Sequence, residues 1–251
     1  MRAFAALVWH EILERKALLA AAVVASVLPV FAPILSGAGS SPPEDIREVA
    51  MWVMILGLVP LFAVLLGVSF IGRDLAEGRL GFYYAQPLSG ATIWFAKLTA
   101  ALLLIWAAQL IILFPTALLS GEPSRFVAPQ GVFFEAAGPW ISAVAMWVAA
   151  AAVILVAHAF GVAWRARSMW IAVDLVAIAL FVVAARWLIS PFSQIFSAHV
   201  VMAIYAWLVV VGFIALVIAG ASQLTSGRVD AKRGHRALST TLWSVLAVGF
   251  I

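Results

Sequence analysis

Long apolar stretches alternate with short polar segments along most of this chain. A helix needs about 20 apolar residues to cross roughly 30 Å of hydrocarbon, and the length of these stretches suits membrane-spanning helices. We expect six spans, at residues 17–35, 50–71, 93–119, 139–162, 169–190 and 200–222. The predicted fold class is all-α: a polytopic transmembrane helical bundle of six spans plus a partial seventh, with an N-terminal interfacial amphipathic helix.

Residues 1–16 have a different pattern from the spans. Apolar side chains recur there at helical spacing, with most of the charged ones on the other side, which predicts an amphipathic helix in the membrane interface. The apolar residues are Phe4, Leu7, Val8 and Ile12, and the charged ones are Arg2, Glu11, Glu14 and Arg15. The alternative is the solvated start of the first span. The apolar run from Ala17 lacks a convincing cleavage site, so we expect a retained span and not a signal peptide.

Residues 223–251 begin with a basic segment, followed by an apolar stretch from about Leu238. Fourteen residues of helix cover only about 21 Å, short of the hydrocarbon core. We expect either a half-span or, as we favour, a native chain that is longer. The predicted domains are an interfacial helix (1–16), a six-span domain (17–222) and a basic cytoplasmic linker with the start of a seventh span (223–251).

Basic residues gather in alternate loops, as expected for loops that stay in the cytoplasm. With the N-terminus inside, only three Lys or Arg residues are outside and twelve are inside. The outer ones are Arg47, Arg125 and Arg186; the inner ones are Arg2, Arg15, Lys16, Arg73, Arg79, Lys97, Arg165, Arg167, Arg228, Lys232, Arg233 and Arg236. We therefore expect a cytoplasmic N-terminus.

Composition supports the membrane class and excludes others. The chain is 66% hydrophobic and 10% charged, against about 45–50% and 25% for soluble domains. The basic residues lie in short loops and not on one patch, so the net charge of +4 does not indicate nucleic-acid binding. The absence of cysteine excludes disulfides, thiolate metal sites and cysteine nucleophiles.

The most informative segment is residues 71–104. It opens with a charged cluster in which Arg73 and Glu77, four residues apart, can pair across one helical turn. Gly78 and Gly81 then weaken the helix. These features predict a short surface helix on the cytoplasmic side.

The second half of this segment predicts a turn and a re-entry into the membrane. Residues 86–90 have the composition of a turn, and Ser89 or Thr92 is suited to cap the next helix. Lys97 is expected at the cytoplasmic foot of the third span.

This order of residues resembles the cytoplasmic loop between the second and third spans of type-2 ABC exporter permeases. In that family an arginine–glutamate cluster and a glycine precede a Pro-[Val/Leu/Ile]-Ser tripeptide and a lysine. The matching residues are Arg73, Asp74, Glu77, Gly78, Pro87, Leu88, Ser89 and Lys97. The overall plan is similar over about residues 1–225. The chain departs from the family in the aromatic segment 80–84 and in the basic tail 228–236, which is followed by another apolar run.

The resemblance implies several partners. In the family this loop, here 72–92, holds a coupling helix that docks on a separate ATP-binding subunit, which binds ATP and Mg. A second permease protomer, in a homo- or heterodimer, and the bacterial cytoplasmic (inner) membrane are also implied. The docking residues would be Arg73, Asp74, Leu75, Glu77, Arg79, Leu80, Phe82 and Tyr83, with Pro87, Leu88, Ser89 and Lys97 forming the turn and re-entry. The alternative is a solvated loop whose charges only set orientation.

Few ionisable residues interrupt the spans. Asp174, in the fifth span, and His158, near the inner end of the fourth, form a candidate intramembrane polar site. Because a buried charge is costly in a bilayer, we favour an ion pair of Asp174 with Arg165 or Arg167 over a substrate or proton site.

Other chemistry is missing from the sequence. It has no Gly-x-x-x-x-Gly-Lys-Ser/Thr motif for ATP, and its scattered histidines predict no metal site. We expect an exporter permease that is not itself an enzyme. The alternatives are a membrane-embedded assembly or scaffold protein, and a lipid-acting membrane enzyme that uses Asp174 and His158. The scarcity of intramembrane polar groups favours a lipid-like or peptide-like cargo over a small ion.

Overall fold

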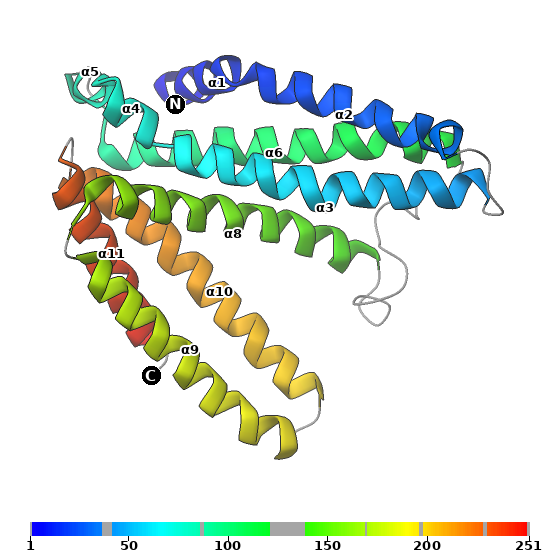
Figure 1. Ribbon diagram of the computed structural model, residues 1–251. Helices are drawn as coiled ribbons and strands as arrows, with labels where there is room; N and C mark the ends of the chain where they lie inside the picture. Colours follow the sequence, from blue (N-terminus) through cyan, green and yellow to red (C-terminus); the bar gives the residue numbers. More distant parts are fainter. Residues whose placement is uncertain are drawn as a thin grey trace. The chain divides into compact units, whose positions relative to one another are not determined.

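The computed structural model describes residues 2–36, 42–85, 88–120, 139–168, 170–195, 198–227 and 230–249. Every regular element in these ranges is a helix (Figure 1), which confirms the all-α prediction. The elements are α1 (Arg2–Glu14), α2 (Lys16–Leu35), α3 (Pro43–Ser69), α4 (Gly72–Ala76), α5 (Arg79–Ala85), α6 (Gly90–Ser120), α8 (Pro139–Ala166), α9 (Trp170–Ile195), α10 (Ala198–Ser222), η1 (Gln223–Gly227) and α11 (Ala231–Gly249).

Five of the described helices, namely α2, α3, α6, α8 and α10, are long and apolar enough to cross a membrane. The remaining expected span, the fifth along the chain (169–190), corresponds to α9, which has 26 residues. Its described apolar part is the shorter segment Trp170–Val183. The composition of these helices is that of a membrane protein, and the number of six spans stays a prediction.

The helices divide into two compact units. The first contains residues 1–67 and 96–157, and the second contains residues 68–95 and 158–251. Along the chain, α3, α6 and α8 each begin in one unit and end in the other. The loop between α3 and α6 belongs entirely to the second unit.

In the first unit, α3 and α6 contribute the largest buried faces. Met51, Ile55, Val59 and Phe62 of α3 recur every three or four residues and are all buried. The buried face of α6 has many alanines, including Ala100, Ala101 and Ala108, and α2 adds Ala22 and Ala25. Small side chains at such positions allow helix backbones to approach closely in a membrane bundle.

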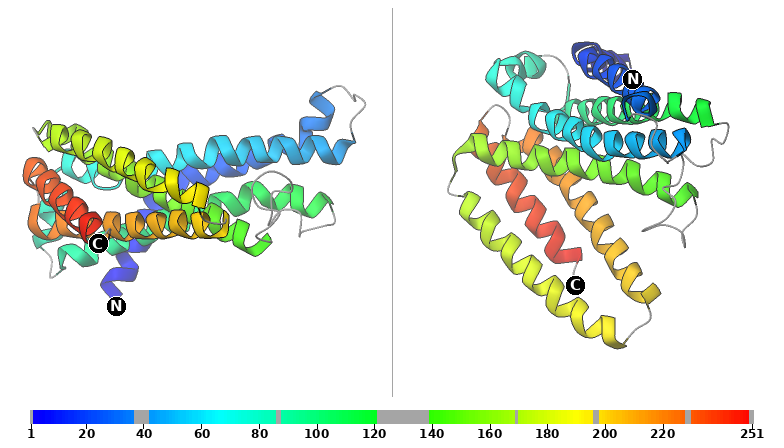
Figure 2. Two further views of the ribbon diagram at one scale, coloured as in Figure 1. Left: turned by 90° about the horizontal axis from the view of Figure 1, so that it is seen from below. Right: turned by 45° about the vertical axis from the view of Figure 1, so that its right-hand side comes forward.

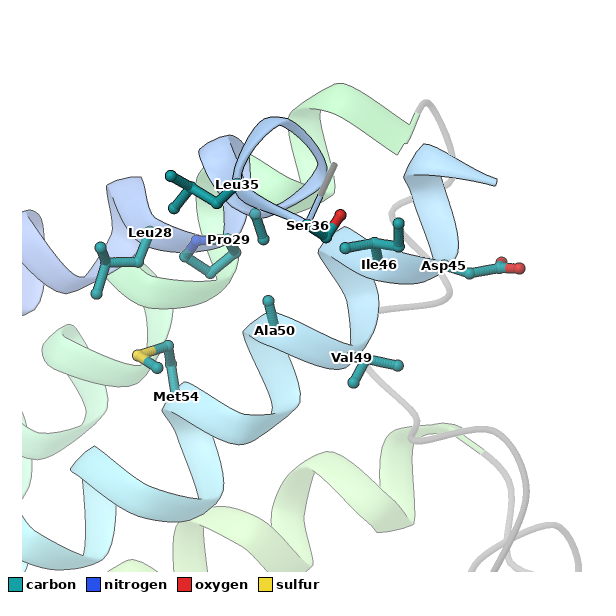
Figure 3. Close-up of a pocket in the computed structure, with 10 residues that line it drawn as sticks. Leu28, Pro29, Leu35, Ser36, Asp45, Ile46, Val49, Ala50 and Met54 are labelled. Atoms are coloured by element: carbon teal, nitrogen blue, oxygen red, sulfur yellow. The ribbon is translucent and has the colours of Figure 1, made fainter. Parts of the chain in front are cut away.

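An open groove of about 670 Å³ lies in the same unit, between the C-terminal half of α2 and the N-terminal half of α3. Figure 3 shows its lining, with Leu28 and Met54 toward one end and Ser36 and Asp45 toward the other. Nearly all of the lining is apolar. The groove therefore has polar chemistry only at its Ser36–Asp45 end.

In the second unit, α11 lies between α9 and α10 (Figure 2). Val211 and Ala215 of α10 form a small core with Leu246 of α11, and Phe181 of α9 packs against it. This packing holds the C-terminal helix against the two helices that precede it in the chain.

The helix bounds match the predicted spans to within five residues at each end, except at the start of α3. The second span was expected to begin at residue 50, after the polar segment that follows the first span, but α3 begins at Pro43. Proline suits the first turn of a helix, and Glu44 and Asp45 there interact favourably with the positive end of the helix dipole. These signals outweigh the polarity of the segment.

The C-terminal segment also differs from its expected form. Residues 231–249 form one amphipathic helix, whereas a linker up to about residue 237 and an apolar stub were expected. Asp230 caps its start, since Oδ1 accepts from the backbone N–H of Lys232 at 2.9 Å. The buried face includes His235 and Ser239, and these polar residues conceal the helical period from a search for apolar runs.

A substitution at Gly90 tests how closely the start of α6 packs in the second unit. A Cβ at this position would lie 2.7 Å from the carbonyl oxygen of Leu224 and 2.9 Å from its carbonyl carbon. Because backbone atoms cannot move aside as a flexible side chain can, we expect Gly90→Ala to destabilise the protein by about 1–3 kcal/mol, as overpacking does. Thermal unfolding in detergent measures this.

Gly57→Ala is the matched control, because a Cβ at Gly57 meets nothing within 4 Å. Gly57→Ala is expected to leave the midpoint temperature unchanged or to raise it slightly through better helix propensity. Equal midpoints for the two variants would contradict the packing at Gly90.

Candidate functional site

The loop between α3 and α6 consists of two short helices that meet at a glycine. α4 ends in a cap at Glu77, and Gly78 follows with a φ of 69°. This left-handed conformation costs a glycine little, whereas it strains most other residues. α5 then begins at Arg79. The single surface helix predicted from the sequence is therefore two helices with a sharp change of direction between them.

Both short helices are fixed to other parts of the second unit. The guanidinium of Arg165, at the end of α8, donates a hydrogen bond to the carbonyl oxygen of Gly72 at the start of α4. The hydroxyl of Tyr84 in α5 donates to the carbonyl oxygen of Leu224 at 2.6 Å. These two bonds attach the loop to the ends of α8 and α10.

Leu224 lies in the π-helical turn η1, which continues α10. Such turns are rare and widen the helix, so backbone carbonyls there can be reached by groups outside it. Leu224 itself is fully buried. Its carbonyl contacts the second half of the loop at two points, because it accepts from Tyr84 and lies against the backbone at Gly90.

Three buried aromatic rings form the base of the loop. Phe70 follows α3, Trp94 lies in the first turns of α6 and His158 lies in α8, and their ring centroids are 4.9–5.2 Å apart. Nε2 of His158 lies 2.9 Å from Oε1 of Gln223 in η1, so its N–H donates to that amide. His158 is therefore a buried structural group of this base.

Above this base, one group of loop side chains is accessible. Phe82 is 65% exposed. Arg73 and Arg79 both pair with Glu77, at 2.8 Å and 2.6 Å, with side chains that are 36–41% exposed. We call Arg73, Glu77, Arg79 and Phe82 the exposed loop face. The Arg73–Glu77 pair that the sequence predicted is present.

Glu77 remains ionised well below neutral pH. The hydrogen bond from Arg73 lowers the pKa of Glu77 below its usual value, and the charges of Arg73 and Arg79 act in the same direction. The exposed loop face therefore presents two guanidinium groups around one carboxylate, next to an aromatic ring.

The other predicted loop residues have different positions. Tyr83 and Asp74 are buried within the chain, at 6% and 4% exposure, so they are not on the accessible surface. The side chains of Leu75 and Leu80, and residue Pro87, lie outside the described part of the chain. Leu88 is half-buried.

Ser89 caps α6, as one of the two predicted alternatives. Its Oγ accepts a hydrogen bond from the backbone N–H of Thr92 at 3.1 Å, and the two hydroxyls are 2.8 Å apart. A capping serine satisfies one of the helix's first N–H groups, which have no partner inside the helix.

Lys97 lies in the first unit and pairs with the N-terminal helix. Its ammonium group forms a buried ion pair with Glu11 of α1, and both side chains are 1% exposed. Arg15 donates to the same carboxylate. Most of the charged residues of this helix were expected on its polar side; Glu11 is an exception, because it follows Leu7 by four residues and shares its buried face.

Asp174 has partners that the sequence did not indicate. Its Oδ2 accepts from Nε2 of His235 at 2.8 Å, and its Oδ1 accepts from Ser239 at 2.5 Å and from the indole N–H of Trp243 at 2.8 Å. All three donors are on α11. Arg165, one of the expected partners, instead binds Gly72.

This cluster has the residue types of a Ser-His-Asp triad without its geometry. In a triad the histidine accepts the serine proton, and the aspartate orients the histidine. Here Ser239 and His235 both donate to the same carboxylate. Among the described residues, no group of three His, Asp or Glu side chains could hold a metal ion.

Asp174 and His158 have no hydrogen-bond partner in common among the described residues, and their joint site stays a prediction. His158 bonds Gln223, whereas the donors to Asp174 are all on α11. The residues that sequence reasoning missed include Glu11, Tyr84, Leu224, His235 and Ser239. The i,i+4 spacing of Leu7 and Glu11, and of His235 and Ser239, was the available signal for three of them.

The chain matches no protein-family model, no curated protein and no solved structure. A function for this chain is therefore proposed from the geometry of its own residues.

The Asp174 cluster should hold α11 in place. In Asp174→Asn, an amide NH₂ group replaces one of the two acceptor oxygens and faces side chains that are themselves donors. An unsatisfied buried polar group costs about 1–3 kcal/mol. We expect faster proteolysis within residues 231–249 and a lower unfolding midpoint. Asp230→Asn is the control, because this exposed cap of α11 retains an acceptor oxygen, and it should behave like wild type. Equal resistance to proteolysis in the two variants would contradict the role of Asp174.

The Glu11 pair predicts a dependence on pH. Burial by itself raises the pKa of Glu11, but the charges and hydrogen bonds of Lys97 and Arg15 outweigh it and hold the pKa below the usual value of 4.5. A carboxylate with a lowered folded-state pKa stabilises the fold above its unfolded pKa and loses that contribution as pH falls through the folded value. Hydrogen exchange in α1 should be constant from about pH 7 to 5 after correction for intrinsic rates, and protection should fall below about 4.5.

Glu11→Gln removes the titrating group and should abolish this transition. A transition of equal size in the variant would assign it to another carboxylate.

Proposed function

We propose that this chain is the membrane-spanning permease subunit of an ATP-driven ABC exporter, coupled through loop 72–92 to a separate ATP-binding subunit. The observation that carries the proposal is the exposed loop face, Arg73, Glu77, Arg79 and Phe82, on a loop that is fixed at both ends. In this proposal ATP and Mg bind to the partner subunit, and the chain itself is not an enzyme.

The chemistry of the exposed loop face suits a protein partner. Arginine and aromatic residues are enriched where interfaces gain most of their binding energy. Glu77 holds both guanidinium groups in defined positions, which reduces the entropy lost on docking. The ring of Phe82 is exposed, whereas the next residue along the chain, Tyr83, is buried. A solvated loop that only sets orientation has no need of an exposed aromatic ring.

The connections of the loop suit the transmission of force. The loop begins directly after α3 and ends directly at α6, two helices with the length and composition of membrane spans. Because α4 and α5 are bonded to the ends of α8 and α10, a displacement of the docked loop would also move those helices. Rigid attachment of this kind is what a transmission element requires.

The proposal includes the membrane and a second protomer. The chain would lie in the bacterial inner membrane with its N-terminus and loop 72–92 in the cytoplasm, would have six spans, and would form a homo- or heterodimer. The positive-inside distribution of Lys and Arg supports this orientation.

A lipid-acting enzyme is the less supported alternative. Both oxygens of Asp174 are engaged by donors of α11, and His158 is buried among aromatic rings. Neither group is positioned to transfer a proton to a substrate. A scaffold role has no feature of the described residues in its favour over transport.

The first test is recovery of an ATP-binding subunit from native membranes with tagged protein. Wild type should recover it, and Arg79→Ala/Phe82→Ala should recover at least about tenfold less, since loss of one hot spot costs about 2 kcal/mol or more. The double variant should still fold, because the exposed Arg79–Glu77 pair contributes little to stability.

Arg233→Ala/Phe114→Ala is the matched control: the Arg233 side chain is 82% exposed, and Phe114 is 65% exposed, as Phe82 is. The control should recover the partner at the wild-type level. If wild type recovers no ATPase even after mild crosslinking, the exporter proposal fails. Equal recovery by both double variants would mean that docking is elsewhere.

A further inference from the structure

The attachment of α1 to the rest of the first unit depends on few side chains. Only Leu7 and Glu11 are buried in this helix. Its other large apolar residues include Trp9 and Leu13, which are 62% and 47% exposed. A helix that lies on an apolar bundle normally buries its apolar face there. Here the most buried side chain is a carboxylate, at 1% exposure.

The partner of this carboxylate explains why a charge is buried. Lys97 of α6 is also 1% exposed, and its ammonium group binds one oxygen of Glu11. Arg15, just after α1, donates to the other oxygen. A buried ion pair is favourable only with good geometry and further hydrogen bonds, and removing one partner is strongly destabilising because it leaves an uncompensated buried charge.

Lys97 occupies a particular place along α6. It lies about two helical turns after Gly90, where α6 begins at the end of the loop. α6 is one continuous helix from Gly90 to Ser120. Whatever displaces the first turns of α6 therefore also displaces Lys97, and Glu11 with it.

We propose that Glu11 is a positioning residue whose ion pair with Lys97 clamps α1 onto α6, so that the movement of the loop end of α6 is passed to α1. The clamp itself is independent of any partner. The transfer of movement rests on the proposed function, because it requires an ATP-binding subunit to move the loop.

The clamp is tested first on the isolated protein. The chain has no cysteine, so Trp9→Cys provides a single exposed site on α1 for a nitroxide spin label. The label should be largely immobile with Glu11 present. Glu11→Gln, which keeps the shape but removes the charge, should increase the mobile fraction several-fold. Arg15→Gln, which keeps the Glu11–Lys97 pair, should give a smaller increase.

Two control variants separate the clamp from general destabilisation. Glu14→Gln changes a glutamate of the same helix that pairs with His10 at 3.5 Å, and it should leave the label immobile. Glu11→Leu/Arg15→Met/Lys97→Met replaces the carboxylate and both of its cationic partners by apolar side chains and should restore immobility, since a buried ionic set can be exchanged in this way. Should Glu11→Gln fail to fold, Arg15→Gln and the triple variant decide. An immobile label in Glu11→Gln, or a mobile one in the triple variant, would overturn the clamp.

The transfer of movement is tested with the ATP-binding subunit and a non-hydrolysable ATP analogue. The nucleotide should change the spectrum of the label at residue 9 with Glu11 present and in Glu11→Leu/Arg15→Met/Lys97→Met. The change should be lost in Glu11→Gln at equal recovery of the partner, a result that a purely stabilising residue would not give. An equal spectral change in Glu11→Gln would overturn the transfer. If wild type binds no ATPase, the proposed function fails, and the label mobility of the isolated protein still decides the clamp.

Discussion

Burying an ionised side chain in an apolar helix bundle requires a partner that replaces water, and this requirement determines how both ends of the chain are attached. Glu11 is held by Lys97 and Arg15, and this set joins α1 to α6. Asp174 is held by three donors of α11, and this set joins α9 to the C-terminal helix. Only 10% of the residues of the chain are charged, and these two carboxylates supply side-chain hydrogen bonds between helices that lie far apart in the sequence.

The candidate site combines a fixed base with an accessible surface. The rings of Phe70, Trp94 and His158 pack together at the base of the loop. The carbonyl oxygen of Leu224, in the turn that continues α10, accepts a hydrogen bond from the hydroxyl of Tyr84. Burial of these groups leaves the guanidinium groups and the ring of Phe82 outside. Two neighbouring aromatic residues in α5, Phe82 and Tyr83, thus have opposite roles, since one is 65% exposed and the other 6%.

The sequence was sufficient for the helices and insufficient for their polar contacts. Apolar runs of membrane length leave little choice of structure, because lipid offers no hydrogen bonds to the backbone, and α2, α6, α8, α9 and α10 lie close to their predicted positions. The Arg73–Glu77 pair and the Ser89 cap were predictable because they are local. Glu11–Lys97 and Asp174–His235 join residues 86 and 61 positions apart, and no local spacing encodes such pairs. The extent of α11 was not evident from apolar runs because polar residues that bind Asp174 occupy its buried face.

In the π-helical turn Gln223–Gly227, the number of residues matters as much as their identity. Such a turn holds one residue more than an α-helical turn of the same span. Deleting a single residue there would replace the wide turn by a regular α-helical one, and the backbone of Gln223–Gly227 would take a different course. Gln223 and Leu224, which contact His158 and Tyr84 from this wide turn, would then lose the positions that they have in it. Insertions and deletions at the end of α10 are therefore expected to be far less tolerated than substitutions, which would distinguish this junction from the other connections between its helices.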